Sequence, residues 1–306
     1  MRKNIVFVEK ALETSQIVKS PVMGKLVWKS LAFPRYYFEL ISGYIGFLRY
    51  GKQYQYRQIV IFGLPKSGTT WIEKALALFP GFQSISVMPW VQLAALRGAS
   101  KGIDIAERKV LNYQIPATFF SRHHNKLLVV KIHSALSPYH ADLLRQNNLK
   151  YLIVYRDIRD VAVSYVHFVR SRPWHPLHEK FSAVNFEEGL IRFAQVIAPL
   201  YLDWIEQSLT NLDEHGMVIT YEEMKNDFSV VFRKVCQHFS LPAMNVRRVE
   251  NILASSAYKG VTHFRKGIIG EWEEVFSDDV KKSFQDSVER MGRLNEILNK
   301  HPEGMA

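Results

Sequence analysis

The chain of 306 residues is 47% hydrophobic and 13% aromatic, which is enough to bury one large core. Its single cysteine, Cys236, excludes an intrachain disulfide and favours a reducing compartment. The N-terminal candidate membrane span, Leu40 to Leu48, is far shorter than the roughly 20 residues that a membrane helix needs. We therefore expect a soluble, cytoplasmic, enzyme-sized protein without a secretory leader.

The net charge of +11 is concentrated at the N-terminus. Residues 1–57 contain ten Lys or Arg and three Glu, a balance of +7, together with many aromatic residues. We interpret residues 1–56 as a basic, aromatic helical segment packed on a main domain of residues 57–306. Weak contact with a membrane surface is the alternative. We do not expect nucleic-acid binding, because neither an arginine-rich run nor a nucleic-acid-binding motif accompanies this charge.

Short apolar runs alternate with helical stretches along the main domain. Four runs predict strands buried on both faces of a sheet: Gln58 to Phe62, Lys126 to Ile132, Tyr151 to Tyr155 and Met217 to Thr220. The expected helices are Thr70 to Phe79, Pro138 to Gln146 capped by Ser137, Ile158 to Val169, Phe186 to Leu209, Tyr221 to Phe239 and a last helix from Ser277. This order predicts one doubly wound α/β domain with a mainly parallel sheet, whose ligands bind at the carboxyl ends of the strands.

The first strand leads into the sequence Pro-Lys-Ser-Gly-Thr-Thr-Trp at residues 65–71. A glycine-containing turn from a strand into a helix is a phosphate cradle. Gly63 and Gly68 keep the spacing of a Walker A loop, but Thr69 stands where that loop has its lysine, and Lys66 lies inside the loop. We therefore expect a nucleotide whose reactive end differs from that of ATP.

The second and third strands also end in polar residues. Lys131 and His133 follow each other at a spacing of two, which places them on the same side of the second strand. A histidine at a strand end is a candidate general base, and its structural alternative is a histidine bonded to a backbone carbonyl. The third strand ends at Arg156, which either binds an anion or pairs with Asp157 or Asp160 at a helix start.

Near the C-terminus, residues 264–272 contain two adjacent cations, Arg265 and Lys266, and two glycines, Gly267 and Gly270. The segment lacks a hydrophobic period. It predicts a loop that closes over an anion, and a solvated loop is the alternative.

These motifs resemble those of sulfotransferases that use 3′-phosphoadenosine 5′-phosphosulfate (PAPS), in particular the cytosolic branch with small-molecule acceptors. Residues 65–71 are similar to the family's 5′-phosphosulfate loop, and Tyr155 through Phe168 to its 3′-phosphate motif. Residues 221–224 resemble its tyrosine-bearing segment, and residues 265–272 its closing loop. The four motifs occur in matching order and cover residues 58–276.

The resemblance implies a role for each matching residue. The 5′-phosphate would be held by Lys66, Ser67, Gly68, Thr69 and Thr70. The 3′-phosphate would be held by Arg156, Ser164, Arg265, Lys266 and Gly267. Trp71 and Tyr221 would contact adenine, His133 would be the base, and Lys131 would lie beside the sulfonate. Two phosphate-type anions on one nucleotide require two separate cation clusters, and the sequence supplies both.

The expected reaction is an in-line attack of an acceptor hydroxyl on sulfur, with His133 removing the proton. Lys66 would then meet the charge that grows on the bridging oxygen. We expect no metal, because sulfonate carries less charge than a phosphoryl group and the histidines lack metal-ligand spacing.

The closing loop departs from the family pattern at Glu271, where aspartate is usual, and at Glu273, where lysine is common. Adenine contacts near Ser255 and Ser256 rest on a weak match. The family's short dimerisation motif is not visible, so the oligomeric state stays open.

Three other functions remain as alternatives. A P-loop kinase of a small metabolite would need lysine directly after Gly68 and an acidic Mg²⁺ ligand, for which Asp157 is the candidate. A non-enzymatic nucleotide-binding module would not need His133 and Lys131 beside the cradle. A carbohydrate sulfotransferase would use a carboxylate base.

The acceptor is expected to be a small aromatic or lipid-like hydroxyl compound. Its pocket would draw on residues 82–124 and 171–185, whose aromatic side chains are Trp90, Tyr113, Phe119, Phe120 and Trp174 among others.

Overall fold

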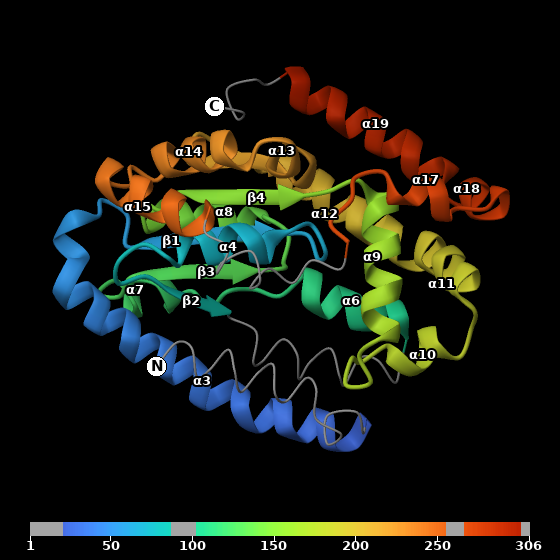
Figure 1. Ribbon diagram of the computed structural model, residues 1–306, viewed down its shortest axis with the longest axis horizontal. Helices are drawn as coiled ribbons and strands as arrows, with labels where there is room; N and C mark the ends of the chain where they lie inside the picture. The colour runs from blue at the N-terminus through green and yellow to red at the C-terminus, as the bar shows by residue number, and fades with distance from the viewer. Residues whose placement is uncertain (1–20, 87–101, 255–265, 301–306) are drawn as a thin grey trace.

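The computed structural model describes residues 21–86, 102–254 and 266–300. Its centre is a sheet of five parallel strands in the order β2-β3-β1-β4-β5 (Figure 1). The strands are β1 (Gln58–Gly63), β2 (Gln83–Ser86), β3 (Leu128–Ile132), β4 (Tyr151–Tyr155) and β5 (Gly216–Thr220). The predicted α/β fold with a parallel sheet is therefore confirmed, and all four predicted strands are present.

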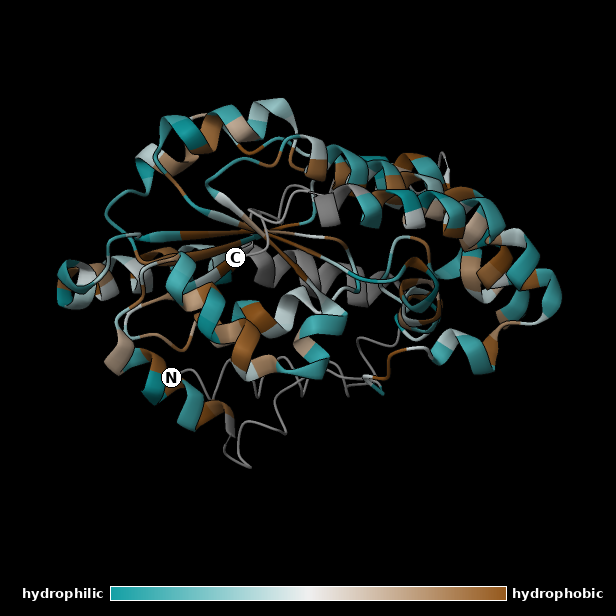
Figure 2. Cartoon of the chain, turned by 90° about the horizontal axis from the view of Figure 1, so that it is seen from above, coloured by the Kyte–Doolittle hydropathy of each residue, from teal (hydrophilic) through white to brown (hydrophobic). Residues whose placement is uncertain are grey.

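Helices cover both faces of the sheet, which Figure 2 shows edge-on between two helical layers. Alternate residues of β1 enter different cores. Val60 and Phe62 belong to the larger core, and Ile59 and Ile61 to the smaller one. Because all six residues of β1 are buried, the strand reads as a continuous apolar run in the sequence.

The following helices connect strands that are successive in the sequence or come after the last strand. They are α4 (Thr69–Leu76), α6 (Ile103–Leu111), α7 (Phe119–Arg122), α8 (Pro138–Gln146), α9 (Ile158–Arg170), α10 (His178–Ser182), α15 (Ala243–Ala254), α17 (Glu271–Val275), α18 (Asp278–Ser283) and α19 (Gln285–Lys300). The side chains of Ser137 and Ser277 accept hydrogen bonds from the first turns of α8 and α18, so both predicted helix starts are confirmed.

Two long predicted helices are interrupted. The stretch Phe186 to Leu209 forms α11 (Phe186–Arg192), a π-helical turn η2 (Phe193–Ile197) and α12 (Ala198–Thr210). Pro199 lacks the backbone N–H that a regular helix would use there. The stretch from Tyr221 breaks into α13 (Tyr221–Asn226) and α14 (Phe228–His238), because Asp227 leaves the helical conformation and caps α14.

The N-terminal helix α3 (Pro21–Tyr50) lies along the β2 edge of the sheet, followed by the short turn η1 (Gly51–Gln53) (Figure 1). Gly46 faces the turn after α4 so closely that a Cβ atom there would come within 2.1 Å of the Gly81 carbonyl oxygen. The Gly43 carbonyl accepts a hydrogen bond from the Leu127 amide at 3.1 Å. The division into a segment 1–56 and a domain 57–306 stays a prediction.

Among the described helices, none combines the length and apolarity needed to cross a membrane.

Candidate active site

The carboxyl ends of β1, β3, β4 and β5 lie at one edge of the sheet, where the arrowheads in Figure 1 point towards α9. The register pairs Ile61 of β1 with Lys131 of β3, and Gly63 with Val154 of β4. The cradle, His133, Arg156 and Tyr221 follow these strand ends, and Lys131 is the penultimate residue of β3. The parallel sheet therefore brings together the residues that the sequence placed at strand ends.

The cradle is a tight loop between β1 and α4. Lys66 and Gly68 both have positive φ, 70° and 77°, and Gly68 caps α4. A Cβ atom on Gly68 would lie 2.7 Å from Cδ2 of Tyr221, so the tyrosine ring lies directly against the loop. The positive φ of Lys66 is uncommon for a residue with a side chain, and it is the kind of backbone strain found at functional sites.

Two buried polar atoms at this edge have no hydrogen-bond partner among the described residues. They are Oγ of Ser67 in the cradle and Nε of Arg156 after β4. A buried polar group left unpaired costs about 1–3 kcal/mol. Both are donors, so they fit an anionic ligand with a phosphate at each position, as the two phosphate ends of PAPS require.

Lys66 points towards α9, where its Nζ lies 4.1 Å from the centre of the Phe168 ring. The rings of Trp174 and His175 in turn lie edge-on to Phe168. The lysine of the cradle is thus bordered by an aromatic group of three side chains.

His133 is held by the cradle strand itself. Its Nδ1 lies 2.5 Å from the Gly63 carbonyl oxygen, so Nδ1 carries the proton and donates. Burial, followed by the positive charge of Lys131, lowers the pKa of His133 to about 4. The imidazole is therefore neutral at physiological pH, with the lone pair on Nε2. The hydrogen bond to a backbone carbonyl, which the sequence left open as the structural alternative, is therefore present, and it leaves Nε2 unprotonated.

Lys131 has a partner that the sequence did not reveal. Its Nζ lies 2.6 Å from Oε2 of Glu73 and donates to the Thr70 hydroxyl at 3.2 Å. Glu73 is buried in α4, and its other oxygen accepts a hydrogen bond from Ser84 of β2. Lys131 is thus fixed at the edge of the cradle, next to one of the residues expected to hold the 5′-phosphate.

Arg156 is buried and makes three contacts. It donates to the Ile268 carbonyl at 2.7 Å and pairs with Asp160 at 3.2 Å. Its guanidinium carbon lies 4.0 Å from the centre of the Tyr221 ring. The pairing with Asp160 that the sequence left open is therefore present, but it uses a terminal nitrogen of the guanidinium group and not Nε.

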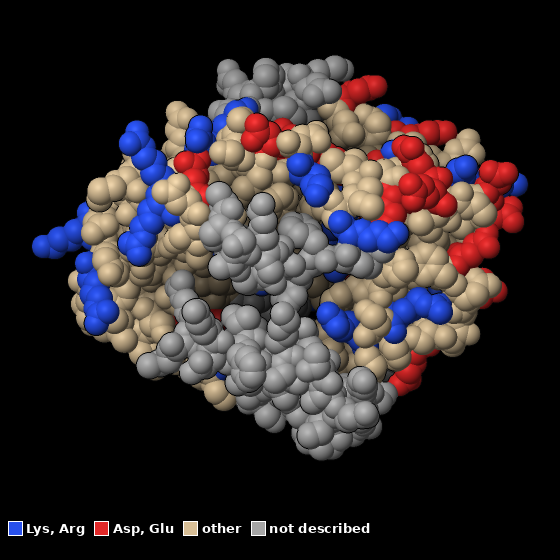
Figure 3. Space-filling model, in the orientation of Figure 1, with Lys and Arg blue, Asp and Glu red and all other residues tan. Residues whose placement is uncertain are grey.

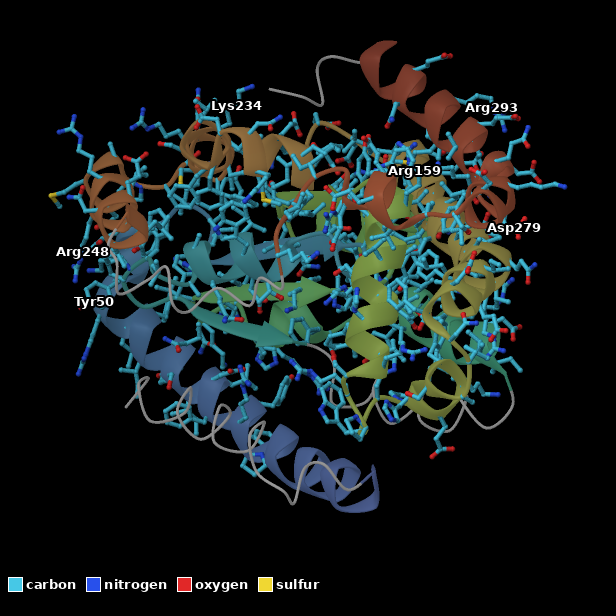
Figure 4. The ribbon with its side chains drawn as sticks, turned by 45° about the vertical axis from the view of Figure 1, so that its right-hand side comes forward. Tyr50, Arg159, Lys234, Arg248, Asp279 and Arg293 are labelled. Atoms are coloured by element: carbon cyan, nitrogen blue, oxygen red, sulfur yellow. The ribbon has the colours of Figure 1, made fainter. Side chains whose placement is uncertain are left out.

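Asp160 also holds in place residues 266–272, the described part of the predicted closing loop, which we call the closing segment. It accepts hydrogen bonds from the backbone amides of Gly270 and Trp272, which begin α17. In the same region, which Figure 4 marks by Arg159, the Arg159 guanidinium lies 3.7 Å from the centre of the Trp272 ring. Nothing in the sequence indicated that Asp160 connects α9 to this segment.

The remaining predicted residues have varied positions. Lys266 pairs at 3.2 Å with Glu271, the residue that stands where the family usually has aspartate. Gly267 has a φ of 67°. Ser164 is partly exposed on α9. Trp71 stacks on Phe228, with ring centres 4.3 Å apart and planes 10° apart. Outside the described residues lie Arg265, Ser255, Ser256 and Trp90.

Two of the residues expected to line the acceptor pocket lie in the protein core instead. Phe119 and Phe120 are 5% and 1% exposed and pack edge to face. They begin the short helix α7, whose apolar side faces the sheet. Tyr113 and Trp174 are partly exposed, as an acceptor site requires.

In the part of the chain that the structure describes, no group of three or more His, Cys, Asp or Glu side chains is arranged to hold a metal ion.

The model of the family described as "Sulfotransferase domain" matches residues 56–296. The chain belongs to the sulfotransferase family. The match starts two residues before β1 and includes the cradle, His133, Arg156 and the closing segment.

The relatives of this chain are distant. It is 27% identical to Sulfotransferase 6B1 of Danio rerio over 45% of the chain and 50% of the relative. It is 24% identical to luciferin sulfotransferase of Photinus pyralis, over 68% of the chain and 57% of the relative. It is also 24% identical to flavonol 3-sulfotransferase of Flaveria bidentis, over 76% of the chain and 81% of the relative. The match thus spans only about half the length of the first two.

Solved structures share the fold. Mouse sulfotransferase SULT7A1, solved in complex with PAP, aligns over 85% of this chain and 95% of its own with a TM-score of 0.51 and 20% identity. Sulfotransferase STF9 from Mycobacterium avium aligns over 91% of this chain and 88% of its own, with a TM-score of 0.50 and 13% identity.

The Glu73–Lys131 pair should contribute strongly to the stability of this protein. Breaking a buried pair leaves one charge without a partner, so Glu73→Gln and Lys131→Met should each lower the free energy of unfolding by about 3 kcal/mol. The double variant should cost much less than the sum of the two. Urea denaturation of all four proteins measures the coupling between the two residues.

The exposed pair of Asp142 and Arg145, 2.7 Å apart, is the matched control, and its coupling should stay below about 1 kcal/mol. If the Glu73–Lys131 coupling were as small as that of the control, the pair would not be what fixes Lys131.

Proposed function

We propose that this protein is a cytoplasmic enzyme that transfers the sulfonate group of PAPS to a hydroxyl of a small acceptor. The observation that carries the proposal is the position of His133 against Gly63, the glycine that begins the cradle. It sets a neutral imidazole with an available Nε2 beside the loop that carries Lys66. Family membership supports the same donor, and the buried free thiol of Cys236 suits the cytoplasm.

In this mechanism, His133 accepts the proton of the acceptor hydroxyl at Nε2 as the oxygen–sulfur bond forms. The bond between sulfur and the bridging oxygen breaks, and its electron pair stays on the 5′-phosphate of the product, adenosine 3′,5′-bisphosphate (PAP). Lys66 donates to that oxygen as its charge grows, an interaction stronger in the transition state than before it. The Gly63 carbonyl keeps the proton of the neutral imidazole on Nδ1, so that Nε2 is the nitrogen that reacts.

The donor nucleotide would be held at both ends. The unpaired Oγ of Ser67, with Gly68, Thr69 and Thr70, supports a 5′-phosphate site at the N-terminus of α4. The unpaired Nε of Arg156 supports a 3′-phosphate site, which Ser164, Arg265, Lys266 and Gly267 would complete. Tyr221 and Trp71 would contact the adenine from the same edge.

Lys131 would act through its charge on the sulfonate side of the cradle. Its ammonium group lies against Thr70 and is fixed by Glu73. The same charge helps to keep His133 neutral, because it lowers the pKa of the imidazole.

The acceptor would be aromatic or lipid-like. The aromatic group beside Lys66, formed by Phe168, Trp174 and His175, supports such a compound. Two relatives are named for luciferin and flavonol. The family match argues against the small-metabolite kinase, and a carbohydrate acceptor remains as the alternative.

The test is transfer of labelled sulfonate from PAPS to a panel of phenols, sterols, long-chain alcohols and sugars. We expect transfer to a phenol or to an alcohol of low polarity. Transfer to sugars alone would contradict the acceptor class, and no transfer to any compound would contradict the function.

The low pKa of His133 gives a further expected result in the free protein. Its imidazole should stay neutral down to about pH 5 and titrate near pH 4, well below the ordinary value of 6.5. Its folded-state pKa is depressed, so this group favours folding above pH 6.5 and loses that contribution as the pH falls towards 4. Nitrogen NMR of the imidazole, assigned by comparison with His133→Ala, measures the midpoint. A midpoint at or above 6.5 would contradict the proposed burial of a neutral base.

A further inference from the structure

Helix α3 presents an apolar face to solvent. Six large hydrophobic side chains on it are between 39% and 64% exposed: Tyr37, Phe38, Ile41, Tyr44, Ile45 and Leu48. Their spacing of three and four residues places them on one stripe of the helix. A contiguous exposed stripe of this kind on a monomer indicates a binding surface.

The orientation of the helix is fixed by its other face. Leu40, Gly43 and Gly46 are buried. Gly43 packs against the start of β3 and Gly46 against the turn at Gly81, and neither position has room for a side chain. Helix α3 therefore cannot turn its apolar stripe inwards without losing this close packing.

Basic side chains flank the stripe on both sides. Arg35 and Arg49 are exposed on α3 itself. On the other side of the stripe, Nζ of Lys126, which lies two residues before β3, is 5.8 Å from the centre of the Tyr44 ring. Arg57 lies over Phe47, 4.8 Å from its ring centre. Figure 3 shows Lys and Arg side chains along the left edge of the molecule, where α3 ends and α15 lies, whereas Asp and Glu gather mainly at the upper right.

Acidic side chains are almost absent from this part of the chain. Glu39 is the only acidic residue between Glu13 and Glu73 in the sequence. It is only partly exposed and pairs with Arg35 at 2.8 Å. An apolar, aromatic stripe with basic edges complements a surface that is apolar inside and negatively charged outside.

We propose that α3 docks this protein onto the surface of an anionic lipid bilayer. Tyr37, Phe38, Ile41, Tyr44, Ile45 and Leu48 would enter the boundary between headgroups and acyl chains. Arg49, Lys52 and their basic neighbours would lie at the headgroup level, where a negative surface attracts them.

The docking surface lies close to the candidate active site. Glu39, on the inward side of α3, lies within electrostatic range of Glu73 and Lys131. Docking through α3 would place the bilayer, in which a lipid-like acceptor dissolves, on the α3 side of the candidate active site. This part of the inference rests on the proposed function, whereas docking itself does not.

The test is sedimentation of the full chain with vesicles of phosphatidylglycerol and phosphatidylcholine, compared with vesicles of phosphatidylcholine alone. We expect wild-type protein to bind the anionic vesicles and to dissociate as salt is raised. Ile41→Glu/Leu48→Glu should weaken binding at least about tenfold, a change of about 1.4 kcal/mol. The matched control Val230→Glu/Met244→Glu, at exposed positions on α14 and α15, should bind like wild type.

A second variant, Arg49→Gln/Lys52→Gln, leaves the apolar stripe intact and should reduce only the preference for anionic vesicles. Equal binding by wild type and Ile41→Glu/Leu48→Glu, or no binding by wild type, would overturn the proposal. So would a wild-type dimer in gel filtration that becomes monomeric in Ile41→Glu/Leu48→Glu, since a second copy would then cover the stripe. Each variant is shown to be folded by its binding of PAP. If the wild-type protein itself did not bind PAP, that result would contradict the proposed function and not the docking.

Discussion

Arg156→Ala is expected to weaken PAP binding by roughly a hundredfold, or about 2.7 kcal/mol. Arg156 is the buried cation after β4, and its Nε has no hydrogen-bond partner among the described residues. A charge-assisted hydrogen bond to phosphate, made in a buried site, contributes strongly to binding. Calorimetric titration of PAP into wild type and variant measures the loss directly.

Arg159→Ala is the matched control for this change. Arg159 lies three residues further on, in the first turn of α9, pairs with Asp157 at 2.6 Å and also lies over an aromatic ring, but it has no role in the proposed phosphate site. Its replacement should leave PAP affinity within a few-fold. Thermal unfolding of both variants separates loss of the site from loss of the fold, since Asp160 loses its buried partner in Arg156→Ala. Equal PAP affinity in Arg156→Ala and wild type would remove the 3′-phosphate site from this residue.

His133→Ala is expected to lower kcat by about 10²–10⁴, the usual contribution of a general base. PAP binding should stay within a few-fold of wild type, because the imidazole meets the acceptor and not the nucleotide in the proposed mechanism. Steady-state transfer from PAPS, measured with the acceptor found in the panel, gives kcat and KM separately.

His124→Ala is the control, because His124 is exposed and bonds only to the nearby Ser121 carbonyl among the contacts described. Its kcat should equal that of wild type. A His133→Ala variant with nearly full kcat would show that another group, such as a carboxylate, is the base.

The fold could be predicted where each strand is buried on both faces. β1, β3, β4 and β5 read as apolar runs because nearly all of their side chains are buried, Lys131 and Thr220 at the carboxyl ends being partly exposed. β2 has the sequence Gln-Ser-Ile-Ser and lies at the edge of the sheet, paired only with β3. A polar edge strand carries no such run, so the sequence could not distinguish it from a loop.

The candidate site could be predicted in part, for a related reason. Lys66, His133 and Arg156 all lie just after strands, and a parallel sheet brings its strand ends together whatever the details of packing. Glu73 and Asp160 lie inside helices, where an acidic residue is ordinary in sequence. Their partners, Lys131 and the amides of Gly270 and Trp272, come from other elements and are known only from the fold. Phe119 and Phe120 show the opposite case, since aromatic residues suit a core as well as a pocket.

The central claim is that this edge of the sheet binds a nucleotide with two separate phosphates, one at Lys66 and one at Arg156. Calorimetric titration of the wild-type protein with PAP and, separately, with AMP tests it most directly, because AMP lacks only the 3′-phosphate. The account predicts that PAP binds at least about tenfold more tightly than AMP, since one charge-assisted contact is worth about 1.5–3 kcal/mol. Equal affinity for the two nucleotides, or no binding of PAP, would contradict it.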